Sequence, residues 1–184
     1  MAALLADLPI RIAHLGDVPG VVLPPEGETS YVDNALGKAR AAASATGHMA
    51  LADDSGIEVD ALGGRPGVLS ARFGAEGLDD AGRNAAMLEA LRDVPPTRRT
   101  ARYRAVIALV DAGGREAVTE GVVEGVLVQE PRGSGGFGYD PLFFYPPFGA
   151  TFAEVPAEQK HAVSHRAVAM ARAQQILAEW LGTK

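Results

Sequence analysis

The segment Arg102–Val110, with the sequence RYRAVIALV, places the strongest constraint on the fold. Its first half alternates polar and apolar residues, and its second half is wholly apolar, which is typical of a strand inside a sheet. Gly113 and Gly114 then indicate a hairpin turn, and a second β-rich stretch is expected over residues 117–129. The chain is therefore expected to build a sheet with at least one inner strand.

Helical patterns alternate with these strands. Residues 33–46 form an alanine-rich run that ends at Gly47, a residue favoured just after a helix. Residues 79–92 and 164–181 also carry apolar side chains at helical spacing. A helix is expected around residues 4–8 as well, followed by a short β-leaning stretch at residues 10–15. Helices interspersed with strands predict an α/β fold with a mixed β-sheet, and 184 residues suit a single domain over 1–184.

Charge and composition exclude several classes of protein. Seventeen Lys and Arg against 23 Asp and Glu give a net charge of −6, which disfavours binding to nucleic-acid polymers. The absence of cysteine excludes disulfides and thiolate metal sites, and fits a cytoplasmic protein. No apolar run approaches the roughly 18 residues that span a bilayer, so no membrane partner is expected.

Paired acids follow a short apolar run at residues 48–52, which is expected to be a strand ending at Asp53-Asp54-Ser55-Gly56. Carboxylates in this position suit Mg²⁺, which prefers oxygen ligands and bridges to phosphates. An ordinary turn is the alternative reading, because acids and glycine are common turn residues. Aspartic proteases share the Asp-Ser-Gly triplet, but the predicted helices argue against that fold.

A glycine-rich segment at residues 133–141, GSGGFGYDP, is the second candidate site. Glycines allow backbone to approach a ligand closely, and a purine can stack on an aromatic ring. A pocket is expected nearby because seven of the eleven aromatic residues lie between Phe137 and Phe152. A glycine-rich loop before a core strand at residues 142–145 is the alternative, and it accounts for Phe143 and Phe144.

Basic residues form the third candidate, in KHAVSHR at residues 160–166. Ser164 could cap the last helix, leaving His165 and Arg166 in its first turn, where cations oppose the helix dipole. Cations placed at such a cost suggest a ligand, although a solvated basic turn is the alternative. Farther upstream, Asn34 and Lys38 share one helix face. Glu26, Glu28 and Lys38 read as surface charges unless that helix faces Asp54.

Three motifs in this order, ADDSGIEVDALGGRPGVLSARF, GSGGFGYDPLFF and KHAVSHRA, together with VDNALGKARAA, resemble the inosine/xanthosine triphosphate pyrophosphatase family. These house-cleaning enzymes hydrolyse deaminated purine nucleoside triphosphates such as ITP, dITP and XTP. The resemblance implies an elongated mixed sheet flanked by helices, with two lobes and a cleft between them, and usually a homodimer. It implies Mg²⁺-dependent cleavage between the α- and β-phosphates, giving the monophosphate and pyrophosphate.

The resemblance also implies roles for individual residues. Asp54 matches the family's metal ligand and general base, and Ser55 matches a substrate contact. Phe137, Gly138, Tyr139 and Asp140 match the segment that holds the base, and Lys38 is expected near the phosphates. The remaining residues implied for base recognition are Lys160, His165 and Arg166. For the second metal ligand we choose Glu26, with Glu28 as the alternative.

One family element is expected to be missing. In the family, a strand and a loop of the form threonine/serine-x-asparagine-x-x-lysine precede the helix that matches the start of this chain. A catalytically weak or inactive purine-nucleotide-binding protein is therefore the alternative function. Other pyrophosphohydrolase folds are disfavoured, because neither a Nudix box nor paired glutamate-rich helices occur in the sequence.

Overall fold

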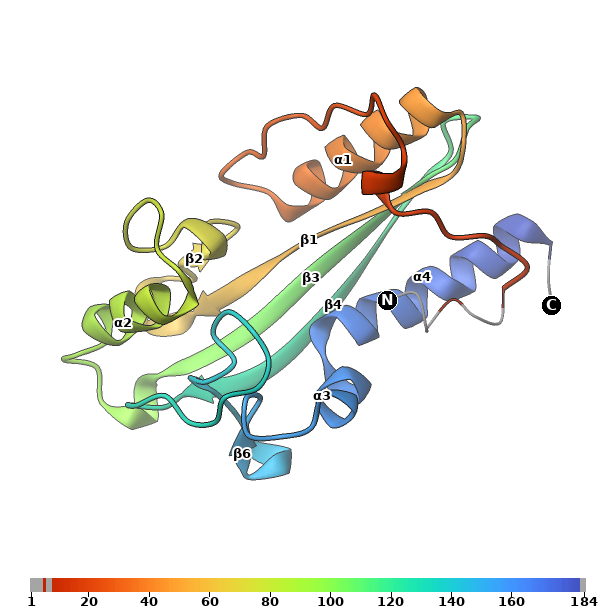
Figure 1. The fold of residues 1–184 in the computed structure, drawn as a ribbon. Coiled ribbons are helices and arrows are strands. Elements are labelled where there is room, and N and C mark those ends of the chain that lie inside the picture. Colours follow the sequence, from red (N-terminus) through yellow and green to blue (C-terminus); the bar gives the residue numbers. More distant parts are fainter. Residues whose placement is uncertain (1–4, 6–7, 183–184) are drawn as a thin grey trace. The chain divides into compact units, whose positions relative to one another are not determined.

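A six-stranded sheet with helices packed against it organises the chain (Figure 1). The computed structural model describes residue 5 and residues 8–182. The sheet order is β2-β1-β3-β4-β5-β6, and the β1–β2, β4–β5 and β5–β6 pairs run antiparallel. The strands are β1 (Ala50–Val59), β2 (Pro66–Gly67), β3 (Thr100–Val110), β4 (Glu116–Leu127), β5 (Phe143–Tyr145) and β6 (Ala150–Thr151). The described α-helices are α1 (Tyr31–Thr46), α2 (Asp80–Ala90), α3 (Ala157–Val163) and α4 (His165–Leu181).

The predicted α/β fold is confirmed, and so is the inner position of the 102–110 strand, because β3 lies between β1 and β4. The helix expected over 33–46 is α1. Its N-cap is Ser30, whose hydroxyl oxygen accepts a hydrogen bond from the Asp33 N–H, and Gly47 ends it with a left-handed φ of 66°. Among the described residues, no helix is both long and apolar enough to cross a membrane.

The described residues divide into two compact units. The first comprises those within Met1–Asp54, Ala105–Gly121 and His165–Lys184, and the second those within Ser55–Arg104 and Val122–Ser164. Strands β1, β3 and β4 each contribute residues to both units.

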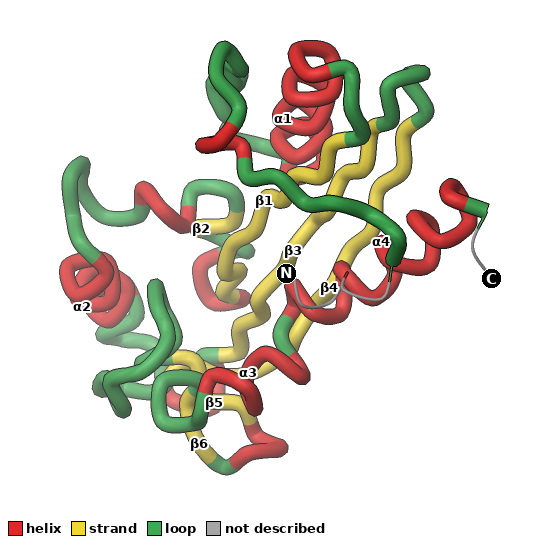
Figure 2. The backbone as a smooth tube through the Cα atoms, turned by 45° about the vertical axis from the view of Figure 1, so that its right-hand side comes forward, coloured by secondary structure: helices red, strands yellow, loops and turns green. Residues whose placement is uncertain are grey.

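In the first unit, one face of β3 packs against α4. Ala105, Ile107 and Leu109 alternate along the strand and share a core with residues of α4, which are Ala169, Met170, Ala173 and Leu177. Helix α1 lies on the other side of these strands, as Figure 2 shows, and buries Ala35, Ala39 and Ala43. This arrangement fixes the face of α1 that carries Asn34 and Lys38.

In the second unit, α2 and the aromatic residues form the core. Met87 of α2 and Leu91, the C-cap of that helix, are fully buried with Ile57, Leu142 and Phe143. Arg99 is also buried, and its side chain donates to the carbonyl oxygens of Leu91 and Val94, beyond the last turn of α2. The segment that follows α2 is therefore held by the side chain of the residue just before β3.

Three local expectations are wrong. The strand expected at 48–52 does not end at Asp53: β1 continues to Val59, because Ile57 and Val59 extend the apolar pattern into the core. Asp54 therefore sits in mid-strand. Lys160 lies in a helix, α3, rather than in a basic turn. A β-leaning stretch at Ile10–Leu15 contains no strand, and the helix expected around residues 4–8 falls largely outside the described residues.

Candidate functional site

Asp54, in the first unit, is a buried carboxylate that contacts two polar side chains of α1. It is only 8% exposed, in the middle of β1. Its Oδ2 accepts a hydrogen bond of 2.9 Å from Asn34 Nδ2, and its Oδ1 lies 3.6 Å from Lys38 Nζ. A buried carboxylate is costly unless hydrogen bonds or a cation compensate its charge, and both are present here.

Glu26 joins the same group through Lys38. Lys38 Nζ donates to Glu26 Oε1 at 2.7 Å, so one ammonium group contacts two carboxylates. We call Glu26, Asn34, Lys38 and Asp54 the carboxylate cluster. Glu26 and Glu28 are both exposed, and it is the ion pair with Lys38 that favours Glu26.

Asn34 is a residue that the sequence reasoning placed on the face of Lys38 without giving it a role. Its Oδ1 accepts from the Gly27 N–H at 2.7 Å, and its Nδ2 donates to the Gly27 carbonyl at 3.2 Å as well as to Asp54. Asn34 therefore ties the loop that carries Glu26 to β1. The helical spacing of Asn34 and Lys38 was the one available signal, because four residues bring them to one face.

A small pocket adjoins the cluster. Its volume is about 250 Å³, and it is lined by residues between Pro24 and Gly37, including Glu26 and Asn34. The described residues hold no group of three or more acids or histidines arranged for a metal ion. A cation at the cluster would therefore have at most two protein carboxylates.

The basic residues at the start of α4 also belong to the first unit. Arg166 Nε donates to Asp53 Oδ2 at 2.8 Å, which compensates a cation in the first turn of a helix. His165 is buried at the first position of α4. Asp53, the neighbour of Asp54, therefore serves an ion pair.

In the second unit, the structure brings Phe137, Asp140 and Lys160 together. Asp140 Oδ2 accepts from the Phe137 N–H at 2.8 Å and from Lys160 Nζ, and Asp140 Oδ1 accepts from the Tyr103 hydroxyl at 3.2 Å. The Lys160 ammonium also lies 4.2 Å from the centre of the Phe137 ring. The Phe137 residue is nonetheless 56% exposed.

Much of the aromatic cluster between Phe137 and Phe152 lies in the core. Tyr139, Phe143 and Phe152 are buried in the core of the second unit, and Phe143 and Phe152 pack with ring centres 5.0 Å apart. The glycine-rich loop precedes a core strand, as the alternative reading held, because large rings are buried where the sheet needs apolar volume. Of the aromatic residues between 137 and 152, only Phe137 is among the exposed large hydrophobic residues.

Tyr139 is buried and anchors the glycine-rich loop to the segment around Ser70. Its hydroxyl donates to the Ser70 carbonyl oxygen at 2.8 Å, and burial raises its pKa to about 12. The Tyr103 hydroxyl is also buried, and burial together with the Asp140 charge raises its pKa well above the ordinary value of 10.0. Ser55, expected to contact substrate, is half-buried in β1 beside Asp54.

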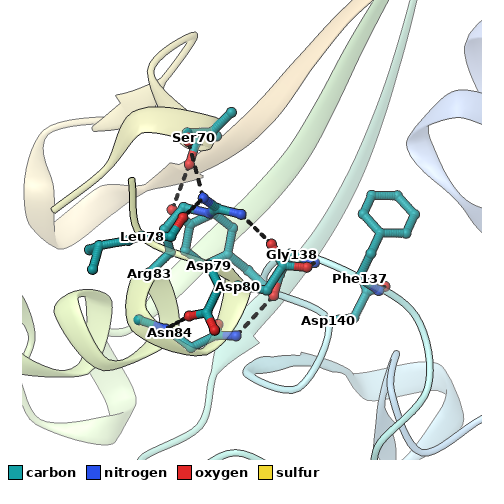
Figure 3. A network of polar contacts seen from close by, with 12 residues as sticks. Ser70, Leu78, Asp79, Asp80, Arg83, Asn84, Phe137, Gly138 and Asp140 are labelled. Atoms are coloured by element: carbon teal, nitrogen blue, oxygen red, sulfur yellow. Dashed lines mark hydrogen bonds and ion pairs between the residues drawn. The ribbon is translucent and has the colours of Figure 1, made fainter. Parts of the chain in front are cut away.

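Helix α2 contributes side chains that the sequence reasoning missed. Asp80 and Asn84 both bond to the backbone of Gly138, and Arg83 lies beside Asp80 (Figure 3). These residues read as ordinary polar positions of an amphipathic helix, because their partner lies more than 50 residues further along the chain. Their spacing of four residues was the only local signal.

Comparisons with known proteins agree with this architecture. A model described as the Ham1 family matches residues 1–176. A dITP/XTP pyrophosphatase of Desulforamulus reducens is 49% identical over 177 residues, covering 96% of this chain and 88% of the relative. A relative of the same description from Geobacter sulfurreducens is 49% identical over 171 residues, covering 93% of this chain and 86% of the relative.

Solved structures show the same likeness. A HAM1 protein from Coxiella burnetii superposes with a TM-score of 0.86 at 40% identity, covering 96% of this chain and 90% of that one. A nucleoside-triphosphatase, or dITP/XTP pyrophosphatase, from Mycobacterium abscessus gives a TM-score of 0.77 at 43% identity, covering 96% and 88%.

Proposed function

Because this chain belongs to the Ham1 family, we propose that it hydrolyses deaminated purine nucleoside triphosphates, ITP, dITP and XTP, to the monophosphate and pyrophosphate. The family resemblance seen in the sequence motifs is confirmed by the match over residues 1–176. The observation that carries the proposal is the carboxylate cluster, in which Lys38 contacts both Glu26 and Asp54. Two carboxylates with one nearby ammonium suit a metal-bound phosphate chain.

The donor set fits Mg²⁺. This ion is commonly held by one or two carboxylates together with substrate phosphates and water, rather than by a cage of protein ligands. Glu26 and Asp54 are two such carboxylates, held near one point by Lys38. When bound, Mg²⁺ would polarise the phosphate and offset its negative charge.

Asp54 is the proposed general base. Asn34 holds Oδ2 of its carboxylate and thereby fixes the direction in which the group faces. Asp54 would accept a proton from the attacking water as the water oxygen bonds to the α-phosphorus. The bond from that phosphorus to the bridging oxygen breaks, and pyrophosphate leaves with the electron pair. Lys38 would balance charge on the phosphates.

The segment Phe137–Asp140, which we call the base loop, is proposed to hold the purine. The exposed Phe137 ring would stack on the base, and the Lys160 ammonium, 4.2 Å from the ring centre, would help to hold the ring in place. The further substrate contacts that we propose are Ser55, Gly138, Tyr139, Asp140, His165 and Arg166. Donors aimed at the 6-oxo group of inosine would be left unpaired by the 6-amino group of adenine, which disfavours ATP.

We further propose that residues 1–184 act as one functional domain and that the protein works as a homodimer in the cytoplasm. The shared strands β1, β3 and β4 support the first point. The absence of cysteine suits a reducing compartment. Sedimentation of the purified protein tests the dimer directly.

Steady-state kinetics on a panel of nucleotides tests the proposal. With Mg²⁺ present, kcat/KM for ITP, dITP and XTP should exceed that for ATP and GTP by at least about 100-fold. Asp54→Asn should lower kcat by about 100-fold or more while circular dichroism stays unchanged. Equal turnover of ATP and ITP contradicts the proposal. Tight binding of ITP without hydrolysis would instead support the inactive nucleotide-binding alternative.

A further inference from the structure

Gly138 is held on two sides by helix α2. Its N–H donates to Asp80 Oδ2 at 2.6 Å, and its carbonyl oxygen accepts from Asn84 Nδ2 at 2.9 Å. Figure 3 shows both side chains reaching from α2 toward the base loop. Because Asp80 and Asn84 are four residues apart, they lie on one face of the helix and act on the same peptide segment.

The Asp80 carboxylate is itself fixed. The Gly138 N–H, and after it the Arg83 guanidinium, lower the pKa of Asp80 below its ordinary value of 3.8. Arg83 is anchored in turn, since it donates to the carbonyl oxygens of Leu78 and Ala71. Asp80 is therefore a charged acceptor with one orientation, and charged acceptors give stronger hydrogen bonds than neutral ones.

Gly138 needs this support because of its backbone conformation. Its φ of 62° lies in the left-handed region, which favours glycine. Because glycine adopts positive and negative φ about equally readily, the residue alone does not hold this conformation. The neighbouring residues are tied elsewhere, Phe137 through its N–H to Asp140 and Tyr139 through its hydroxyl to Ser70. The two bonds from α2 thus hold the peptide groups on both sides of Gly138, next to the exposed Phe137 ring.

We propose that Asp80 and Asn84 are positioning residues that set the geometry of the base loop and thereby the discrimination between purine bases. This inference rests on the proposed function. Neither side chain needs to touch the nucleotide, because both act through Gly138. Small displacements at such a loop matter, since about 1 Å of misplacement can cost about 100-fold in rate.

Asp79 offers a matched control on the same helix. It is the N-cap of α2, and its Oδ1 accepts from the Gly82 N–H at 2.8 Å, so it supports the helix without bonding to Gly138. Replacing an N-cap residue by alanine destabilises a helix, because a backbone N–H of the first turn loses its acceptor. Asp79→Ala therefore reports what loss of helix stability alone does to base selection.

The experiment compares Asp80→Ala, Asp80→Asn and Asp79→Ala in the full chain, with melting temperature and kcat/KM for ITP and ATP as readouts. Asp80→Ala should lower the ITP-to-ATP ratio about tenfold or more, chiefly through a higher KM for ITP. Asp80→Asn, which keeps an acceptor oxygen for Gly138, should recover most of the ratio. Asp79→Ala should lower the melting temperature and leave the ratio unchanged. If Asp79→Ala and Asp80→Ala change the ratio equally, the inference is overturned.

Hydrogen exchange separates this inference from the proposed function. Failure of the wild-type protein to discriminate between ITP and ATP would contradict the proposed function, and with it the claim about base selection. The positioning claim remains measurable at the Gly138 amide, which should exchange at least about tenfold faster in Asp80→Ala than in the wild type. The Ile57 amide, which donates to Ser70 Oγ, should be unaffected. Unchanged exchange at Gly138 would overturn the positioning role.

Discussion

Lys38 Nζ lies 2.7 Å from Glu26 Oε1, although Glu26 belongs to the loop before the helix that carries Lys38. The same ammonium is 3.6 Å from Asp54 Oδ1 on β1. Asn34 holds the loop that carries Glu26 close to Asp54, because its side chain forms hydrogen bonds with both the Gly27 backbone and the Asp54 carboxylate. In this state the lysine supplies the positive charge that two neighbouring carboxylates require.

Removing that charge should make the protein more sensitive to Mg²⁺. In Lys38→Met the two carboxylates lose their shared cation, so Mg²⁺ should bind the folded state more tightly and stabilise it more. The rise in melting temperature on adding Mg²⁺ should exceed that of the wild type by at least about 2 °C. Arg40 lies on the same helix as Lys38 and pairs with Glu116 of β4, so Arg40→Met removes a different ion pair and should not differ from the wild type. An equal Mg²⁺ effect in all three proteins would count against the cluster as a cation site.

Glu26 and Glu28 form a matched pair for the second metal ligand. Glu26→Gln removes a carboxylate that contacts Lys38, whereas Glu28→Gln alters an exposed side chain two residues away. Glu26→Gln should raise the Mg²⁺ concentration needed for half-maximal activity by about tenfold or more, since ligand charge sets cation affinity. Glu28→Gln should leave it unchanged. A larger effect of Glu28→Gln than of Glu26→Gln would identify Glu28 as the second metal ligand instead.

Tyr139 should give the stability a pH dependence in alkaline solution. Its pKa in the folded state, about 12, exceeds the ordinary value of 10.0. The stability that the neutral Tyr139 hydroxyl contributes is therefore fully present below pH 10 and is lost as the pH rises toward 12. Tyr139→Phe lacks this ionisation but loses the bond to Ser70, at a cost of about 1 kcal/mol near neutral pH. Urea unfolding should therefore show the wild-type advantage shrinking above pH 10, by no more than about 1.4 kcal/mol per pH unit. An advantage that stays constant from pH 8 to beyond pH 11 contradicts the assignment.

Phe137 and Phe143 should separate binding from stability. Phe137 is 56% exposed and Phe143 is fully buried. Phe137→Ala should weaken ITP binding by about 1–3 kcal/mol, the range found for base stacking, with little change in unfolding free energy. Phe143→Ala should cost about 3–5 kcal/mol of stability through the cavity it leaves. Calorimetric titration and urea unfolding of both variants measure the two effects, and a Phe137→Ala protein that binds ITP normally would remove stacking from the account.

The sequence was most informative where a signal was local. Gly47 and the alanine-rich run located α1, and the apolar half of 102–110 located the inner strand β3. It was less informative where tertiary packing determines the bounds of an element. Asp53-Asp54-Ser55-Gly56 has turn-like composition, yet β1 runs through it because the following residues are buried in the core.

The same limit applies to the candidate site. The motifs identified Asp54, Lys38 and the base loop, and the structure joins Lys38 to Asp54 and Phe137 to Lys160. The supporting residues could not be identified in this way, because Asn34 and Asn84 are polar helix positions whose partners lie 20 and 54 residues away. The aromatic cluster was ambiguous in the sequence, because large rings serve a core as readily as a pocket.

The products of ITP hydrolysis test the central claim most directly. Phosphorus NMR of a reaction with ITP, Mg²⁺ and the purified protein distinguishes cleavage at the α–β bond from cleavage at the β–γ bond. The account predicts inosine monophosphate and pyrophosphate as the only initial products, with neither formed by Asp54→Asn. Inosine diphosphate and orthophosphate as the initial products would contradict it.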